Sequence, residues 1–140
     1  FNWGIIMAWV AINNTISTEI ILLYISAIFW TLGYDTIYGA QDMSDDEIIG
    51  LKSTSIKFKD KAKKFLITCY ALLIVFFLIG AYSMNLNYNF YLFMIVPFIH
   101  LFLYQIKIFN LKDPSSCLKA FKSNNFLGLL IFLNILIAKI

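Results

Sequence analysis

Long uninterrupted apolar runs constrain this chain more than any other feature. A helix needs roughly 20 apolar residues to span the hydrocarbon core of a bilayer. Three of the apolar segments reach that length, the last is slightly short, and the first is too short to span alone. The runs are continuous rather than alternating, which predicts helices rather than barrel strands. The five segments are residues 2–12, 20–37, 65–83, 88–109 and 126–140.

The composition supports a membrane location. The chain is 61% hydrophobic and 14% charged, against about 45–50% and about 25% in soluble domains. A soluble fold of 140 residues cannot bury so much apolar surface. This excludes an ordinary cytosolic globule and a disordered tail. We therefore expect an all-α fold, a polytopic transmembrane helical bundle of about five helices.

Charged residues are concentrated in adjacent blocks. Five of the eight acidic residues lie between Asp35 and Glu47, and six of the eleven lysines lie between Lys52 and Lys64. Such blocks differ from the uniformly basic surface typical of nucleic-acid binding, so we expect no nucleic-acid partner. Neither of the two cysteines has a neighbour at metal-ligand spacing, which argues against a zinc site or a disulfide framework.

Lysines occur in alternate connections between the apolar segments. Residues 35–64 and 107–122 are lysine-rich, whereas residues 13–19 and 84–87 contain no lysine. The positive-inside rule then predicts that both lysine-rich connections lie on the cytoplasmic side. We expect an integral protein of a bacterial inner membrane, with its charged loops facing the cytoplasm and the lysines of residues 57–64 touching anionic lipid.

The N-terminal end shows no targeting signal. The chain begins at Phe1 and is apolar at once, without the charged leader and small-residue cleavage site of a signal peptide. We expect this chain to be a piece of a longer protein whose N-terminal portion is missing.

The acidic stretch has the spacing of a cation site. Asp42 and Asp46 are four residues apart and share one helix face. Asp35 precedes Asp42 by seven residues, on nearly the same face and about two turns away. Clustered carboxylates repel one another unless a cation neutralises them, and ligand sets made only of oxygens suit Mg²⁺. The alternative is a plain solvated loop, which has the same composition.

The segment that follows is suited to an anion. Gly50, Lys52, Ser53 and Thr54 lie just beyond the carboxylate pair and can receive a metal-bound diphosphate. The upstream glycine of a P-loop is absent. A substrate with a diphosphate head and a long hydrocarbon tail fits both the charged loop and the apolar helices. His100, inside the fourth apolar segment, is a second functional candidate, with a hydrogen-bonded packing histidine as the alternative.

Three stretches together resemble a known family. The first stretch reads Tyr34-Asp35-Thr36-x-Tyr38-x-x-x-Asp42-x-x-Asp45-Asp46-x-x-x-Gly50-x-Lys52-Ser53-Thr54. It resembles the second aspartate-rich motif of the UbiA superfamily of membrane prenyltransferases, and most closely that of the 4-hydroxybenzoate branch. Phe1-x-Trp3-Gly4-x-x-Met7-Ala8 is similar to the start of that branch's fifth helix. Cys117-x-Lys119-Ala120-Phe121-x-x-Asn124-Asn125-x-x-Gly128 is similar to its final loop and ninth helix.

The resemblance implies a place in a larger fold. The five segments would correspond to helices five to nine of a nine-helix bundle. Residues 1–140 would form the C-terminal half of the prenyltransferase domain, with the second aspartate-rich motif at residues 35–54. The family's other aspartate motif would lie in the missing N-terminal half, which becomes an expected partner. The chain alone would then be inactive.

The resemblance also implies roles for five residues. Asp42 and Asp46 would hold Mg²⁺ against the prenyl diphosphate, and Asp35 would join them as a catalytic residue. Lys52 and Tyr38 would bind the diphosphate. The implied reaction is the Mg²⁺-dependent transfer of a polyprenyl group from polyprenyl diphosphate to the aromatic ring of 4-hydroxybenzoate in ubiquinone biosynthesis.

Other functions remain open at this stage. A different branch of the superfamily would prenylate a haem, menaquinone or archaeal-lipid precursor, although the Asp-Thr-x-Tyr and Asn-Asn elements favour the hydroxybenzoate branch. A non-catalytic membrane subunit would use the carboxylates to bind a cation without diphosphate. An intramembrane aspartyl protease is disfavoured, because it needs a second intramembrane aspartate and the last three apolar segments contain none.

Overall fold

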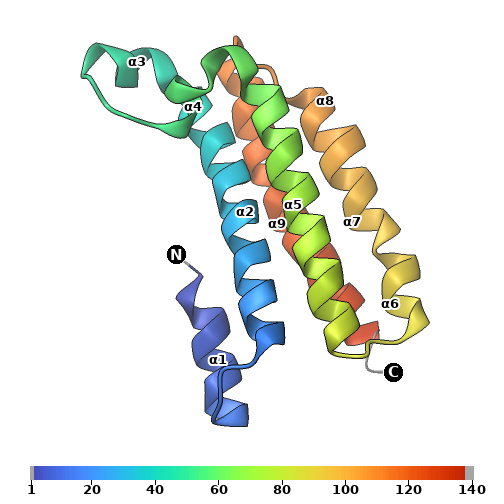
Figure 1. Ribbon diagram of the computed structural model, residues 1–140. Coiled ribbons are helices and arrows are strands. Elements are labelled where there is room, and N and C mark those ends of the chain that lie inside the picture. Colours follow the sequence, from blue (N-terminus) through green and yellow to red (C-terminus); the bar gives the residue numbers. More distant parts are fainter. Residues whose placement is uncertain (1, 138–140) are drawn as a thin grey trace.

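Helices make up all the regular structure that is described. The structure is a computed structural model that describes residues 2–137 (Figure 1). Phe1 and residues 138–140 lie outside this range. Within it there is no strand, which confirms the all-α prediction. The elements are α1 (Trp3–Asn13), α2 (Thr18–Gln41), α3 (Met43–Ile48), α4 (Thr54–Lys57), the 3₁₀ helix η1 (Lys59–Lys61), α5 (Ala62–Ser83), α6 (Tyr88–Phe93), α7 (Ile95–Ile99), the π-helical η2 (His100–Gln105), α8 (Ile106–Ile108) and α9 (Pro114–Ile137).

Long apolar helices run side by side in an elongated bundle (Figure 1). Four stretches of the described chain are long and apolar enough to cross a membrane, and the apolar helix α1 is shorter. This agrees with the five predicted segments. The four stretches are Thr18–Gln41, Lys59–Ser83, Tyr88–Ile108 and Pro114–Ile137.

The last span starts earlier than the sequence analysis predicted. Helix α9 begins at Pro114 rather than at Phe126. Asp113 caps it, since its Oδ1 accepts hydrogen bonds from the Ser115 N–H at 3.0 Å and from the Ser115 hydroxyl at 2.8 Å. These bonds hold the pKa of Asp113 below its ordinary value. Proline suits the first helical position because it has no N–H to satisfy there. The turn that precedes α9 therefore ends at Asp113.

Helix α2 is also longer than predicted. It extends to Gln41, four residues past the expected end at Ile37. The polar residues beyond the apolar run continue the helix out of the membrane region, because helix formation does not require an apolar side chain at each position. As a result Asp35 and Tyr38 both lie on α2.

A chain of close contacts joins α2, α5, η2 and α9. A Cβ atom on Gly33 would lie 2.6 Å from Cε1 of Tyr70, so the helices approach closely there. Tyr70 is buried and donates its hydroxyl hydrogen to Oε1 of Gln105. Nε2 of Gln105 donates to the Ala120 carbonyl and to the Ser123 hydroxyl, each at 3.0 Å. Polar groups in an apolar interior must satisfy one another, and these do.

The fourth span is not a single regular α-helix. Pro97 has no N–H to donate to the Phe93 carbonyl, so the α-helical hydrogen-bond pattern is interrupted between α6 and α7. The next six residues, His100–Gln105, are π-helical. Such segments are often found at functional sites.

The lysine-rich connections lie at one end of the bundle. Helices α3, α4 and α8 lie together at the top of Figure 1, with the N-terminal end of α9. The lysine-free connections, from α1 to α2 and from α5 to α6, lie at the opposite end. The predicted grouping of the loops is therefore confirmed.

Candidate functional site

The predicted carboxylate pair lies where α2 ends. Asp42 ends α2 and Asp46 lies on α3, which extends away from the bundle (Figure 1). The Asp46 N–H donates to the Asp42 carbonyl at 2.9 Å, so one helical turn separates them, as predicted. Asp35 lies further down on α2 and is exposed. It is not part of a three-ligand group with the pair, since no group of three potential ligands (His, Cys, Asp, Glu) occurs among residues 2–137.

The carboxylates of the pair are available to a ligand. Neither Asp42 nor Asp46 uses its carboxylate in a hydrogen bond or ion pair with any other described residue. Glu47, by contrast, is occupied, because both of its oxygens accept from Lys59 Nζ at 2.7 and 2.9 Å. That ion pair joins α3 to η1 and does not involve Asp42 or Asp46.

Gly50 returns the chain toward the bundle. Its φ of +75° is in the left-handed region, which suits glycine. The Leu51 N–H donates to the Asp46 carbonyl at 2.9 Å and the Gly50 N–H to the Glu47 carbonyl at 3.3 Å, which together close α3 as a Schellman motif. Lys52 follows immediately and is exposed. Gly50, which was predicted to bind an anion, therefore ends α3, and the turn that it makes fixes the position of Lys52.

The hydroxyl groups of residues 53–55 bind other parts of the protein. Thr54 Oγ1 lies 2.7 Å from Thr36 Oγ1, which fixes α4 against α2. Ser53 caps α4, since its Oγ accepts from the Ile56 N–H at 3.3 Å, and it also lies 2.7 Å from the Ser55 hydroxyl. The two hydroxyls that the sequence analysis assigned to a diphosphate therefore position α4 in this structure. Of the side chains of Lys52, Ser53 and Thr54, only that of Lys52 makes no hydrogen bond with another described residue.

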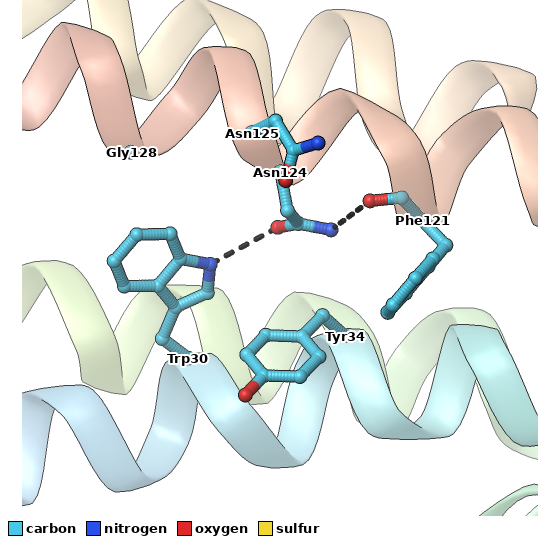
Figure 2. Close-up of a pocket in the computed structure, with 6 residues that line it drawn as sticks. All are labelled: Trp30, Tyr34, Phe121, Asn124, Asn125 and Gly128. Atoms are coloured by element: carbon cyan, nitrogen blue, oxygen red, sulfur yellow. Dashed lines mark hydrogen bonds between the residues drawn. The ribbon is translucent and has the colours of Figure 1, made fainter. Parts of the chain in front are cut away.

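An aromatic pocket lies between α2 and α9 (Figure 2). Its volume is about 540 Å³. Trp30 and Tyr34 project from α2, and Asn124 faces them from α9. The indole Nε1 of Trp30 donates to Oδ1 of Asn124 at 3.0 Å, and Asn124 Nδ2 donates to the Phe121 carbonyl at 3.0 Å. The lining residues are Trp30, Tyr34, Phe121, Asn124, Asn125 and Gly128.

Tyr38 connects this pocket to the acidic end of α2. Its ring centroid lies 4.9 Å from that of Phe121, while the ring of Tyr34 lies 6.1 Å from the same side chain. Trp30, Tyr34 and Tyr38 recur every four residues and so share one face of α2. That face leads from the pocket to Asp42 at the end of the helix. An apolar, aromatic surface thus meets a charged one.

Comparison with known proteins identifies the family. The profile of the UbiA prenyltransferase family matches residues 1–136. The chain belongs to this family. No solved structure gave a significant match.

Curated relatives match along the whole chain. A mitochondrial 4-hydroxybenzoate polyprenyltransferase of Bos taurus is 38% identical over 142 residues, which cover 100% of this chain and 38% of the relative. A 4-hydroxybenzoate octaprenyltransferase of Blochmanniella pennsylvanica is 39% identical over 96% of this chain and 47% of the relative. A 4-hydroxybenzoate geranyltransferase 2 of Lithospermum erythrorhizon is 37% identical over 99% and 45%. The chain spans less than half the length of these relatives.

The donor set of this UbiA family member fits a hard cation. Mg²⁺ is usually held by one or two carboxylates together with substrate phosphates, rather than by a complete protein cage. Asp42 and Asp46 provide two unpaired carboxylates one turn apart. The residues present therefore suit Mg²⁺ bound jointly by protein and substrate.

Several residues that shape the site were not predicted from the sequence. Trp30 was not singled out, although its spacing from Tyr34 and Tyr38 could have placed it on the same helix face. Gly39 and Ser55 were also missed. A Cβ on Gly39 would lie 2.8 Å from the Ser55 hydroxyl, so glycine is needed where α4 packs on α2. Nothing in the local sequence indicates this contact, because it joins residues of two different helices.

Proposed function

We propose that this chain forms part of a membrane enzyme that transfers a polyprenyl group from polyprenyl diphosphate to the ring of 4-hydroxybenzoate, in ubiquinone biosynthesis. One observation carries the proposal. The unpaired carboxylates of Asp42 and Asp46 lie at the end of an aromatic face of α2, in a chain whose curated relatives bear that activity in their names.

Asp42 and Asp46 would hold Mg²⁺, which when bound neutralises the charge that develops on a departing diphosphate. Lys52 would add a positive charge for the diphosphate, and Tyr38 would add a phenolic hydroxyl where the aromatic face of α2 ends. Asp35, one turn before Tyr38 on α2, would contribute a further negative charge from outside the carboxylate pair. None of these residues acts as a nucleophile.

The reaction would be an electrophilic aromatic substitution. The allylic C–O bond breaks and diphosphate leaves with the electron pair. The ring carbon ortho to the phenol hydroxyl forms the new C–C bond, and the ring then loses that carbon's proton. The aromatic walls provided by Trp30, Tyr34 and Phe121 would hold the hydrocarbon tail and exclude water from the carbocation.

A further segment of polypeptide would complete the site. The curated relatives are more than twice as long as this chain, and a cation held by two carboxylates has open positions. We propose that an N-terminal half supplies the facing aspartate motif and the residues that hold the aromatic acid. The lysine-rich end of the bundle would face the cytoplasm from a bacterial inner membrane.

The decisive experiment measures prenylated 4-hydroxybenzoate in membranes that contain the complete enzyme. Asp42→Asn and Asp46→Asn should each lower turnover at least 100-fold at ordinary Mg²⁺. Asp60→Asn is the matched control, because Asp60 is an exposed acid at the same end of the bundle, and it should retain activity. Residues 1–140 alone should be inactive. Near-normal turnover of either aspartate variant would refute the assigned role.

A further inference from the structure

His100 has an unsatisfied polar atom in the membrane-spanning part of the bundle. The side chain is 8% exposed, and its Nε2 is buried without a hydrogen-bond partner among the described residues. An unpaired buried polar atom carries a substantial free-energy cost. Ionisable residues inside membrane spans mark functional sites by default. His100 is also the first residue of the π-helical segment η2.

This histidine lines a pocket of its own. The pocket lies between the fourth span and α9 and has a volume of about 490 Å³. The imidazole lies beside two aromatic rings, with centroids 5.3 Å from Tyr104 and 5.6 Å from Phe126. A flat aromatic ligand suits such surroundings. The lining residues are Val96, Ile99, His100, Tyr104, Ser123, Phe126 and Leu130.

The two pockets lie on different parts of the α9 surface. Asn124 and Asn125 line the pocket next to α2, whereas Ser123 and Phe126 line the pocket next to η2. The two share no lining residue. The His100 pocket is therefore distinct from the proposed catalytic pocket.

We propose that the His100 pocket binds the head group of an uncharged prenylated phenol, whose hydroxyl bonds to His100 Nε2 when the imidazole turns this buried atom toward the pocket. A hydroxyl can both donate and accept, so it satisfies this atom in either tautomer of the ring. The exposed apolar side chains of Val96 and Ile99 would contact the isoprenoid tail. No lysine is among the described residues that line the pocket, which selects against a carboxylate on the ring. The inference depends on the proposed function for one point only, namely that the hydrocarbon tail of the ligand is an isoprenoid.

The sole histidine of the chain gives a direct test. The complete enzyme is labelled with ¹⁵N-histidine in lipid nanodiscs, the resonance of His100 is assigned by its absence from His100→Gln, and the protein is titrated with 2-geranylphenol. The Nε2 resonance should shift in a saturable way. Geranylbenzene, which lacks the hydroxyl, should leave it unchanged, and 3-geranyl-4-hydroxybenzoate should shift it only at about tenfold higher concentration. An equal response to geranylbenzene, an equal response to the carboxylated probe, or an Nε2 that is already hydrogen-bonded without a probe would overturn the proposal.

Variants separate this site from catalysis. Binding of tritiated 2-geranylphenol should weaken about tenfold in His100→Phe, which has no hydrogen-bonding atom, and within about threefold in His100→Gln, which keeps one. Asp42→Asn should bind the probe normally in the complete enzyme even though its turnover is lost. Normal binding by His100→Phe would refute the site and leave the proposed reaction untouched.

Discussion

The indole nitrogen of Trp30 donates to the Asn124 side-chain oxygen at 3.0 Å, across the pocket between α2 and α9. The other end of the same amide donates to the Phe121 carbonyl, which fixes the amide's orientation. The hydrogen bond therefore determines where the largest aromatic side chain of the pocket lies. This bond joins two helices that are far apart in the sequence and sets the shape of the pocket between them.

A double-mutant cycle tests this relationship. Trp30→Phe removes the donor and Asn124→Leu removes the acceptor. Each should raise the KM for polyprenyl diphosphate about 5- to 10-fold in the complete enzyme, because each leaves the partner unpaired in the pocket wall. The double variant should be no worse than the poorer single variant. Strictly additive losses would show that the two side chains act independently.

Close packing at Gly33 gives a stability prediction. A methyl group there would lie 2.6 Å from Tyr70, a buried side chain that is also held by Gln105. Gly33→Ala should destabilise the protein by about 1–3 kcal/mol, measured as a lower Tm in detergent. Gly4→Ala is the matched helical control, since no atom lies within 4 Å of its added carbon. An unchanged Tm for Gly33→Ala would contradict this close approach of α2 and α5.

The sequence predicted the helical spans better than their ends. Apolar runs are governed by solvation, which can be recognised residue by residue, so the five segments are all present. The start of α9 depends instead on Asp113 accepting hydrogen bonds from Ser115 just before Pro114. The same residues are typical of a turn, so the sequence alone does not show that a helix starts there. The break in the fourth span was not predicted either, although the position of Pro97 in the sequence indicates it.

The site was predictable where it depended on spacing along one helix. The one-turn separation of Asp42 and Asp46 follows from their positions in the sequence. The roles of Thr36 and Thr54 do not, because their hydrogen bond joins α2 to α4 and depends on how the chain folds back after α3. For the same reason the hydroxyls of the Lys52 segment were predicted to face a ligand, whereas that of Thr54 holds α4 against α2 and that of Ser53 caps α4.

The arrangement of the loops predicts membrane topology. Lys61 lies at the lysine-rich end of the bundle and Asn85 at the opposite end, between α5 and α6 (Figure 1). Lys61→Cys and Asn85→Cys should react with a membrane-impermeant maleimide from opposite sides. The two native cysteines, Cys69 and Cys117, are buried and should give little background in the unmodified chain. Labelling of both introduced cysteines from one side would contradict the four-span arrangement.

The backbone at Gly50 predicts a link between a helix end and substrate binding. At φ +75° an alanine is strained, whereas asparagine tolerates this region. Gly50→Ala should therefore destabilise the Schellman motif that ends α3, by about 1 kcal/mol, and displace Lys52. We expect faster hydrogen exchange at the Leu51 amide, which donates to Asp46, and a several-fold higher KM for polyprenyl diphosphate. Gly50→Asn should be close to the unmodified protein in both measurements. If Gly50→Ala changed hydrogen exchange but not KM, the turn would serve only to end α3, and Lys52 would not bind the diphosphate.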